Sequence, residues 1–183
     1  MLEKLNARLR EAHPDKIIVP GCGSASARVV LIGEAPGAQE EAQLMPFVGK
    51  AGQNLNEFLE LSGINRGELY ITNAVKFRPT SQGARGLVNR KPTNAEIKDF
   101  RGYLLEELEI IKPVCIVTLG AVPYTALTEK PPVMSEIHGR FTSFDAYTLY
   151  PMYHPASVIY NRSLKDVYRE DVKRLGEWMR KNA

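Results

Sequence analysis

The sequence predicts an α/β fold with three layers, in which helices cover both faces of a central four-stranded, mainly parallel sheet. Two observations carry this prediction. Short apolar runs alternate with helical periodicity along the chain, and 183 residues suffice for one packed core. Apolar residues make up 44% of the composition and charged residues 25%, as in ordinary globular domains. We therefore expect a single domain over residues 1–183.

Four strands are expected where the chain has short apolar, β-rich runs. They cover residues 28–33, 69–75, 114–120 and 147–150, and the last continues into 152–155. Because helical segments lie between them, the strands are expected to run parallel in one sheet.

Helical spacing of apolar residues predicts helices between these strands. They cover 3–12, 49–62, 93 to about 111, a short segment from 121, and 165–181. The third begins with a capping box, in which Thr93 and Glu96 satisfy each other's backbone N–H groups. Residues 80–91 are polar and basic, which predicts a loop.

Composition narrows the classes of protein. No segment approaches the roughly 18 apolar residues of a membrane span. The polar N-terminus lacks the apolar centre of a secretory signal, which predicts a cytoplasmic location. The two cysteines, Cys22 and Cys115, give no basis for a disulfide framework or a zinc site. The formal charge of +3 permits nucleic-acid binding without indicating it.

Polar residues stand at the ends of three expected strands. Glu34 follows Gly33, Asn73 lies in the second strand near its end, and His154 ends the fourth. In open parallel sheets, ligands bind beyond the carboxyl ends of the strands. We therefore expect these residues to meet in one crevice.

The residue types suit recognition of a planar heterocycle. A carboxylate at Glu34 can activate water, and a loop phenylalanine at Phe47 can stack on a flat ring. The Asn73 amide can pair with the edge of a base, and His154 can stabilise negative charge. Each residue also has an ordinary structural interpretation, as a solvated glutamate, a core phenylalanine, a loop-anchoring asparagine or a structural histidine. These residues alone do not identify the base.

Five segments carry a family resemblance. They are Gly33-Glu-Ala-Pro-Gly37, Pro46-Phe-Val-Gly-Lys-Ala-Gly52, Tyr70-Ile-Thr-Asn-Ala-Val-Lys76, Val117-Thr-Leu-Gly120 and His154-Pro-Ala156. In order and spacing they resemble the uracil-DNA glycosylase superfamily, and its family 4 most closely. The resemblance implies an enzyme that flips uracil out of DNA and hydrolyses its bond to deoxyribose, which starts base excision repair. It implies uracil-containing DNA as partner, a monomer, and neither a catalytic metal nor a nucleotide cofactor.

The resemblance also implies roles for individual residues. Gly33, Glu34 and Ala35 would hold the catalytic water and bind a uracil carbonyl through backbone groups. Phe47 would stack on uracil.

Two further residues complete the implied site. Asn73 would read the edge of uracil and help to exclude cytosine, whose exocyclic amine reverses the donor pattern. His154 would contact the O2 side and stabilise the uracil anion as the glycosidic bond breaks.

The chain differs from family 4 at the ligand positions of an iron–sulfur cluster. Members of that family typically carry a four-cysteine iron–sulfur cluster, and the ligand positions align with Asn6, Leu9, Phe77 and Phe100 here. Two thiolates elsewhere in the chain could not hold such a cluster. We therefore expect no cluster, and an apolar plug in its place.

The segment from 80 to 91 is longer than in typical members. Its Arg85, Arg90 and Lys91 suggest a clamp on the DNA backbone, with a solvated loop as the alternative. The segment contains no histidine, so the irreversible trapping found in one branch of the superfamily is not expected.

Beyond the His154 segment, the family usually shows an arginine near the tip that enters DNA. Tyr160 takes that place, with Arg162 beside it. A tyrosine could fill the gap left by the flipped nucleotide.

Two other functions stay open at this stage. One is a nucleic-acid-binding or damage-sensing module that keeps the crevice but turns over poorly, as the lost cluster and altered tip suggest. The other is a glycosylase for another deaminated base such as hypoxanthine, because pocket volume cannot be read from sequence.

Overall fold

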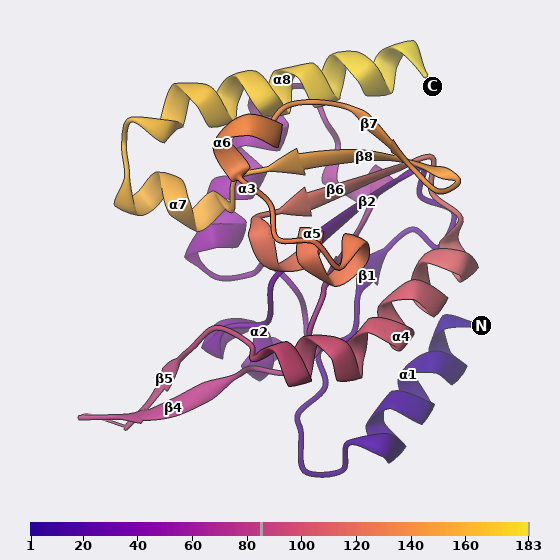
Figure 1. The fold of residues 1–183 in the computed structure, drawn as a ribbon, viewed down its shortest axis with the longest axis vertical. Coiled ribbons are helices and arrows are strands. Elements are labelled where there is room, and N and C mark those ends of the chain that lie inside the picture. Colours follow the sequence, from indigo (N-terminus) through magenta and orange to yellow (C-terminus); the bar gives the residue numbers. More distant parts are fainter. Residues whose placement is uncertain (85, 183) are drawn as a thin grey trace.

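A six-stranded sheet forms the centre of the protein. The computed structural model describes residues 1–84 and 86–182 and orders the strands β1-β3-β2-β6-β8-β7 (Figure 1). The sequence-based prediction of an α/β fold with a mainly parallel sheet is confirmed. The four inner strands run parallel and correspond to the predicted ones: β3 (Leu69–Asn73), β2 (Val29–Gly33), β6 (Cys115–Leu119) and β8 (Tyr147–Met152).

Two short antiparallel strands extend the sheet at its edges, beyond the four that the sequence predicts. β1 (Cys22–Gly23) pairs with β3, and β7 (Thr142–Phe144) pairs with β8. Both have only two or three residues and are largely open to solvent. They therefore lack the run of buried side chains from which a strand is predicted.

The predicted longer helices are all present, with bounds within a few residues of those expected. Three short helices of four to six residues, α2, α6 and α7, were not predicted, because they are too short to show a helical period. The helices are α1 (Leu2–Ala12), α2 (Ala38–Gln43), α3 (Lys50–Leu61), α4 (Asn94–Ile111), α5 (Ala121–Thr128), α6 (Met134–Ile137), α7 (Pro155–Tyr160) and α8 (Leu164–Lys181), with a 3-10 turn η1 at Arg66–Glu68.

Helices cover both faces of the sheet because successive side chains of a strand point to opposite sides. In β2, Val29 and Leu31 pack in a cluster with α3 and α8, whereas Val30 and Ile32 pack with α4 and α5. Figure 1 shows α8 and α4 on opposite sides of the sheet. This arrangement is the predicted three-layer architecture.

The capping box at the start of α4 is also confirmed. The Thr93 side chain accepts a hydrogen bond from the Glu96 N–H at 3.2 Å, and the Glu96 carboxylate accepts one from the Thr93 N–H at 2.7 Å. The helix therefore begins where the sequence predicts.

The prediction of a loop over residues 80–91 is wrong. β4 (Thr80–Gly83) and β5 (Gly86–Asn89) form an antiparallel hairpin that projects from the body of the protein beside α2 (Figure 1). The residues of both strands are exposed or half-buried, and the apolar Leu87 and Val88 are adjacent, so the period of two that marks a half-buried strand is absent. Arg85 lies outside the described residues.

An apolar cluster occupies the region of the family's iron–sulfur ligands. Leu9, Phe77 and Phe100 are buried together, and the Phe77 and Phe100 ring centroids lie 5.5 Å apart. The ring of His13 lies 4.6 Å from that of Phe100. Hydrocarbon side chains provide no thiolate, so these residues do not fit an iron–sulfur cluster. They pack α1 against α4 as the expected plug.

Within the described residues, no helix is both long enough and apolar enough to cross a membrane.

Candidate active site

A crevice of about 510 Å³ opens beyond the carboxyl ends of the parallel strands. An adjoining hollow carries Glu34 and shares Ala35 and His154 with it. The structure thus brings together residues from the ends of β2, β3 and β8, as the sequence predicts. Those that line the crevice include Ala35, Phe47, Asn73, His154 and Tyr160.

Glu34 lies at the turn that follows β2. Its carbonyl accepts a hydrogen bond from the Val75 N–H at 3.1 Å, and the Gly33 carbonyl accepts one from the Ala74 N–H at 2.8 Å. These bonds fix the turn against the end of β3. Burial raises the pKa of the Glu34 carboxyl, and the positive charge of Lys91 opposes that shift. A carboxyl with a raised pKa is a better proton acceptor for a nearby water.

The Phe47 ring is buried against the floor of the crevice. Its backbone has a φ of 56°, in the left-handed region that side chains other than glycine rarely adopt. A Cβ at position 33 would lie 2.5 Å from Phe47 Cζ, and one at position 52 would collide with the Phe47 backbone. Gly33 therefore leaves room for the Phe47 ring, and Gly52 leaves room for the Phe47 backbone.

Asn73 is the last residue of β3 and is buried, with 3% of its surface exposed. Its side chain lines the crevice and makes no hydrogen bond within the described part of the chain. The interpretation of Asn73 as an anchor for a neighbouring loop is therefore not supported. Its amide keeps a donor and an acceptor for a ligand.

His154 caps the first turn of α7. Its Nδ1 accepts a hydrogen bond from the Ala156 N–H at 3.2 Å. Nδ1 consequently carries no proton, and in the neutral ring the proton is on Nε2. Burial lowers the pKa of His154 to about 4, with the charge of Glu40 opposing the shift. At neutral pH the ring is thus an uncharged donor, 6.1 Å from the Phe47 ring between centroids.

Glu40 is a site residue that the sequence analysis missed. Its carboxylate accepts hydrogen bonds from the Gly37, Val48 and Gly49 N–H groups at 3.2, 3.1 and 2.7 Å. It joins the turn that carries Glu34 to the loop that carries Phe47. A glutamate three residues after Gly37 is the available signal, because it matches a helix N3 position.

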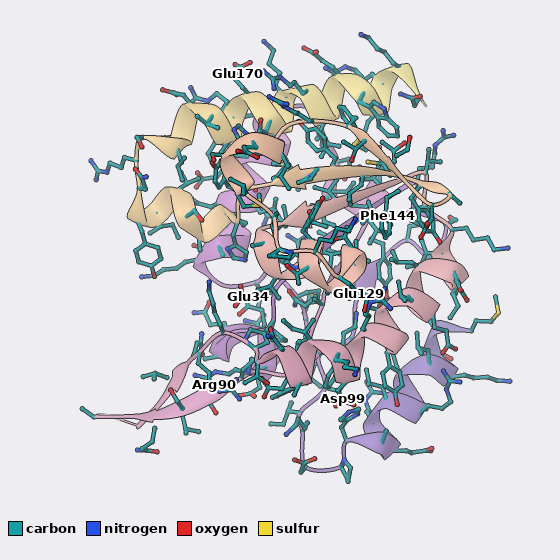
Figure 2. The ribbon with its side chains drawn as sticks, in the orientation of Figure 1. Glu34, Arg90, Asp99, Glu129, Phe144 and Glu170 are labelled. Atoms are coloured by element: carbon teal, nitrogen blue, oxygen red, sulfur yellow. The ribbon has the colours of Figure 1, made fainter. Side chains whose placement is uncertain are left out.

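The expected DNA-contacting residues divide into two groups. Tyr160 is 89% exposed at the end of α7 on the crevice rim, and Arg162 and Lys91 are also exposed. Arg90 differs: its guanidinium donates to both Glu96 oxygens, at 2.8 and 2.7 Å, and to the Thr80 carbonyl at 3.0 Å. Arg90 lies at the base of the hairpin (Figure 2), and its bonds to Glu96 anchor the hairpin to α4. Its expected role as a DNA contact is therefore not supported.

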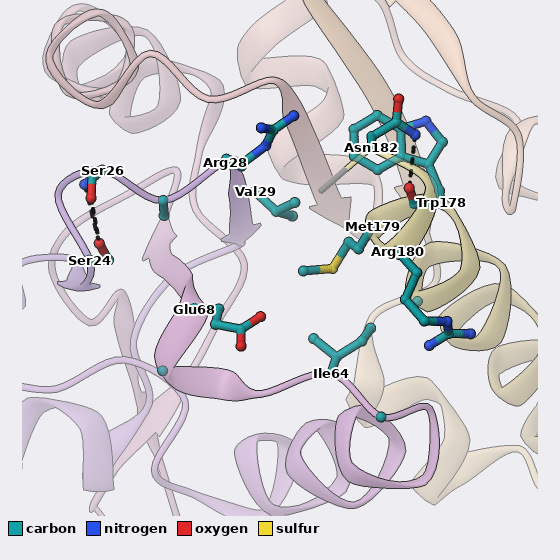
Figure 3. Close-up of a pocket in the computed structure, with 14 residues that line it drawn as sticks. Ser24, Ser26, Arg28, Val29, Ile64, Glu68, Trp178, Met179, Arg180 and Asn182 are labelled. Carbon is teal, nitrogen blue, oxygen red and sulfur yellow. Dashed lines mark hydrogen bonds between the residues drawn. The ribbon is translucent and has the colours of Figure 1, made fainter.

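A second hollow of about 470 Å³ lies at the opposite ends of the strands (Figure 3). Arg28 and Val29 at the start of β2, Glu68, and Met179 of α8 line it. It contains none of the residues that meet in the crevice. The crevice is therefore the candidate active site.

The crevice and the sheet define a class of protein. They describe an α/β protein with a pocket that suits a flat heterocyclic ring at the carboxyl ends of parallel strands. An aromatic ring, an amide and a neutral histidine line the pocket, and a half-buried carboxyl lies in the adjoining hollow.

Comparison with known proteins names the family. The family model described as "Uracil DNA glycosylase superfamily" matches residues 20–176. The chain is 34% identical over 184 residues to the Type-4 uracil-DNA glycosylase of Archaeoglobus fulgidus, covering 96% of this chain and 89% of that protein. It is 36% identical over 171 residues to the Type-4 uracil-DNA glycosylase of Saccharolobus solfataricus, covering 88% and 76%. It is 29% identical over 182 residues to the Type-5 uracil-DNA glycosylase of Pyrobaculum aerophilum, covering 90% and 75%. The chain belongs to the uracil-DNA glycosylase superfamily.

Proposed function

We propose that this protein is a uracil-DNA glycosylase, a hydrolase that removes uracil from DNA and leaves an abasic site for base excision repair. The observation that carries the proposal is the meeting of Phe47, Asn73 and His154 in one crevice, in a chain of this family. A base inside a duplex cannot reach such a pocket, so uracil has to be flipped out of the stack.

The base is recognised by stacking and by its edge. The buried Phe47 ring provides a platform for uracil, and the absence of a side chain at Gly33 leaves room for the ring. The Asn73 amide donates to the uracil O4 and accepts from its N3–H. Cytosine has an amine in place of O4 and no proton on N3, so both hydrogen bonds would be lost.

The bond between C1′ of deoxyribose and N1 of uracil breaks with its electron pair going to the base. The negative charge that develops is spread toward O2, where the Nε2–H of His154 donates a hydrogen bond. A neutral histidine suits this task because it stabilises charge that is present only as the bond breaks.

Water completes the reaction at C1′. The water oxygen bonds to C1′ and Glu34 accepts a proton from that water, which gives the abasic sugar. Burial of the Glu34 carboxyl, which raises its pKa, supports this role. The Gly33 and Glu34 carbonyls fix the turn by accepting from the Ala74 and Val75 N–H groups, and Ala35 lines the crevice beside it.

Contacts with DNA are assigned to Tyr160, Arg162 and Lys91. The exposure of Tyr160 at the tip of α7 supports its insertion into the space that the flipped nucleotide leaves. Arg162 and Lys91 supply positive charge for the backbone on either side.

We further propose that residues 1–183 form one domain that acts as a monomer in the cytoplasm. One sheet with helices on both faces supports a single domain.

The test is multiple-turnover cleavage of oligonucleotides that carry one uracil, in single and double strands, followed by alkali. Hypoxanthine- and thymine-containing oligonucleotides serve as controls. We expect uracil-dependent strand breaks only. Breaks at hypoxanthine instead would assign another base, and binding without breaks would assign a damage-sensing module.

A further inference from the structure

Asn89 is the last residue of β5, at the base of the hairpin. It lines both the crevice and the adjoining hollow, and it is exposed at their rim. Its Nδ2 lies 3.4 Å from the position that a Cβ on Gly37 would occupy. The side chain therefore stands directly beside the turn that follows Glu34. The catalytic scheme above gives this residue no task.

A neighbouring arginine fixes the orientation of the Asn89 amide. Arg78 Nε donates a hydrogen bond to Asn89 Oδ1 at 2.7 Å. Since a guanidinium only donates, the oxygen of the amide has to face Arg78 and the NH₂ group has to face away from it. Arg78 is itself held on its other side, because its Nη1 lies 3.4 Å from a Glu41 carboxylate oxygen.

We propose that Asn89 is a further substrate-binding residue, whose Nδ2–H donates to a non-bridging phosphate oxygen beside the uracil nucleotide. The inference rests on the proposed function. The buried floor already supplies partners for the base, whereas Asn89 is exposed at the rim, where the sugar–phosphate backbone has to pass. Asparagine is a common donor to phosphate. Arg78 is then a positioning residue, which points the amide at the DNA.

The decisive variant is Asn89→Asp. It keeps an oxygen for Arg78, so the base of the hairpin stays anchored, but it loses the donor. A matched control exists in Asn56, an exposed residue outside the crevice whose Oδ1 accepts from Arg66 Nη1 at 2.6 Å. Asn56→Asp adds the same charge and preserves the same kind of arginine contact.

We expect Asn89→Asp to raise KM for a uracil-containing oligonucleotide by about 10-fold or more relative to Asn56→Asp. Inhibition by free uracil should be the same in both variants, because free uracil has no phosphate. Equal KM values for the two variants would overturn the inference and leave Asn89 as a structural residue of the hairpin.

A second measurement identifies the contacted group. A methylphosphonate, which removes a phosphate charge, is placed on the 5′ or the 3′ side of the deoxyuridine. At the contacted phosphate, the methylphosphonate should raise KM less in Asn89→Asp than in the wild type. The variant has already lost the Nδ2–H donor that contacts this phosphate. If the wild type is active but the effects of the methylphosphonate and of Asn89→Asp on KM are fully additive at both positions, this inference is overturned and the proposed function stands. No uracil release by the wild type would overturn the proposed function and this inference with it.

Discussion

The active-site residues take their chemical state from burial and from a few directed hydrogen bonds. His154 is an Nε2–H donor because the Ala156 N–H occupies Nδ1, and it is uncharged because burial lowers its pKa to about 4. The Asn73 amide has a donor and an acceptor open to a ligand, because it is buried at the crevice without a partner in the described chain. The sequence predicts that both residues lie at the site. It does not predict the protonation state of His154 or the unpartnered amide of Asn73.

The neutral state of His154 makes a prediction about stability. Its pKa in the folded protein, about 4, lies below its ordinary value of 6.5, so between these values the unfolded chain binds a proton that the folded chain does not. Stability is therefore unaffected by this group above about pH 6.5 and decreases as pH falls toward about 4.

His154→Asn removes the titrating ring and keeps a side-chain acceptor for the Ala156 N–H. Urea denaturation at about pH 7 and about pH 4.5 should show a smaller loss of stability for the variant than for the wild type. Identical losses would show that His154 does not titrate abnormally.

The Asn73 assignment predicts the effect of a near-isosteric change. In Asn73→Asp an acceptor and a negative charge replace the donor to uracil O4. Uracil excision should fall about 100-fold or more. Because the new carboxylate is buried, the melting temperature is measured as well and the assay is run well below it. A variant that retains wild-type kcat/KM would remove Asn73 from base recognition.

At the scale of elements, two connections hold the site to the fold. Glu40 ties the turn after β2 to the loop of Phe47 through three backbone N–H groups. The cluster of Leu9, Phe77 and Phe100 packs α1 against α4.

Loss of the Glu40 carboxylate should loosen the Phe47 loop. In Glu40→Ala, hydrogen exchange at the Val48 and Gly49 amides should become faster and uracil excision should fall, because the stacking platform is no longer held. Glu57→Ala, which removes an exposed glutamate of α3, is the control. Unchanged exchange at both amides would mean that other contacts hold this loop.

The apolar plug predicts a large effect on stability. Phe100 is fully buried, so Phe100→Ala should lower the free energy of unfolding by about 3–5 kcal/mol. Ile17→Ala, at a residue that is 55% exposed, should change it little. A loss below about 1 kcal/mol in Phe100→Ala would contradict the packing role, and denaturant titration measures both.

Prediction from sequence succeeded where elements bury a regular pattern and failed where they do not. The inner strands are continuous apolar runs, and α4 begins at the capping box of Thr93. The hairpin of β4 and β5 has no buried face, so its sequence lacks the alternating pattern that predicts strands. Glu40 and Asn89 cannot be predicted from the sequence, because their contacts are to backbone N–H groups and to an arginine 11 positions away.

At the scale of the whole molecule, the sheet brings distant segments to one edge. The parallel order of β3, β2, β6 and β8 places Glu34, Asn73 and His154 at neighbouring carboxyl ends, although 120 positions separate the first from the last. Strand alternation therefore predicted the location of the crevice. It could not predict that Arg90 would be used to anchor the hairpin to α4.

The most direct test of the central claim measures free uracil, rather than strand breaks, released over many turnovers from a single-uracil oligonucleotide. The wild type should release more than one equivalent of uracil per enzyme, and Asn73→Ala and His154→Ala should each lose most of that rate while remaining folded. Release that is absent in the wild type, or undiminished in both variants, would contradict the assignment of this crevice as the site of uracil excision.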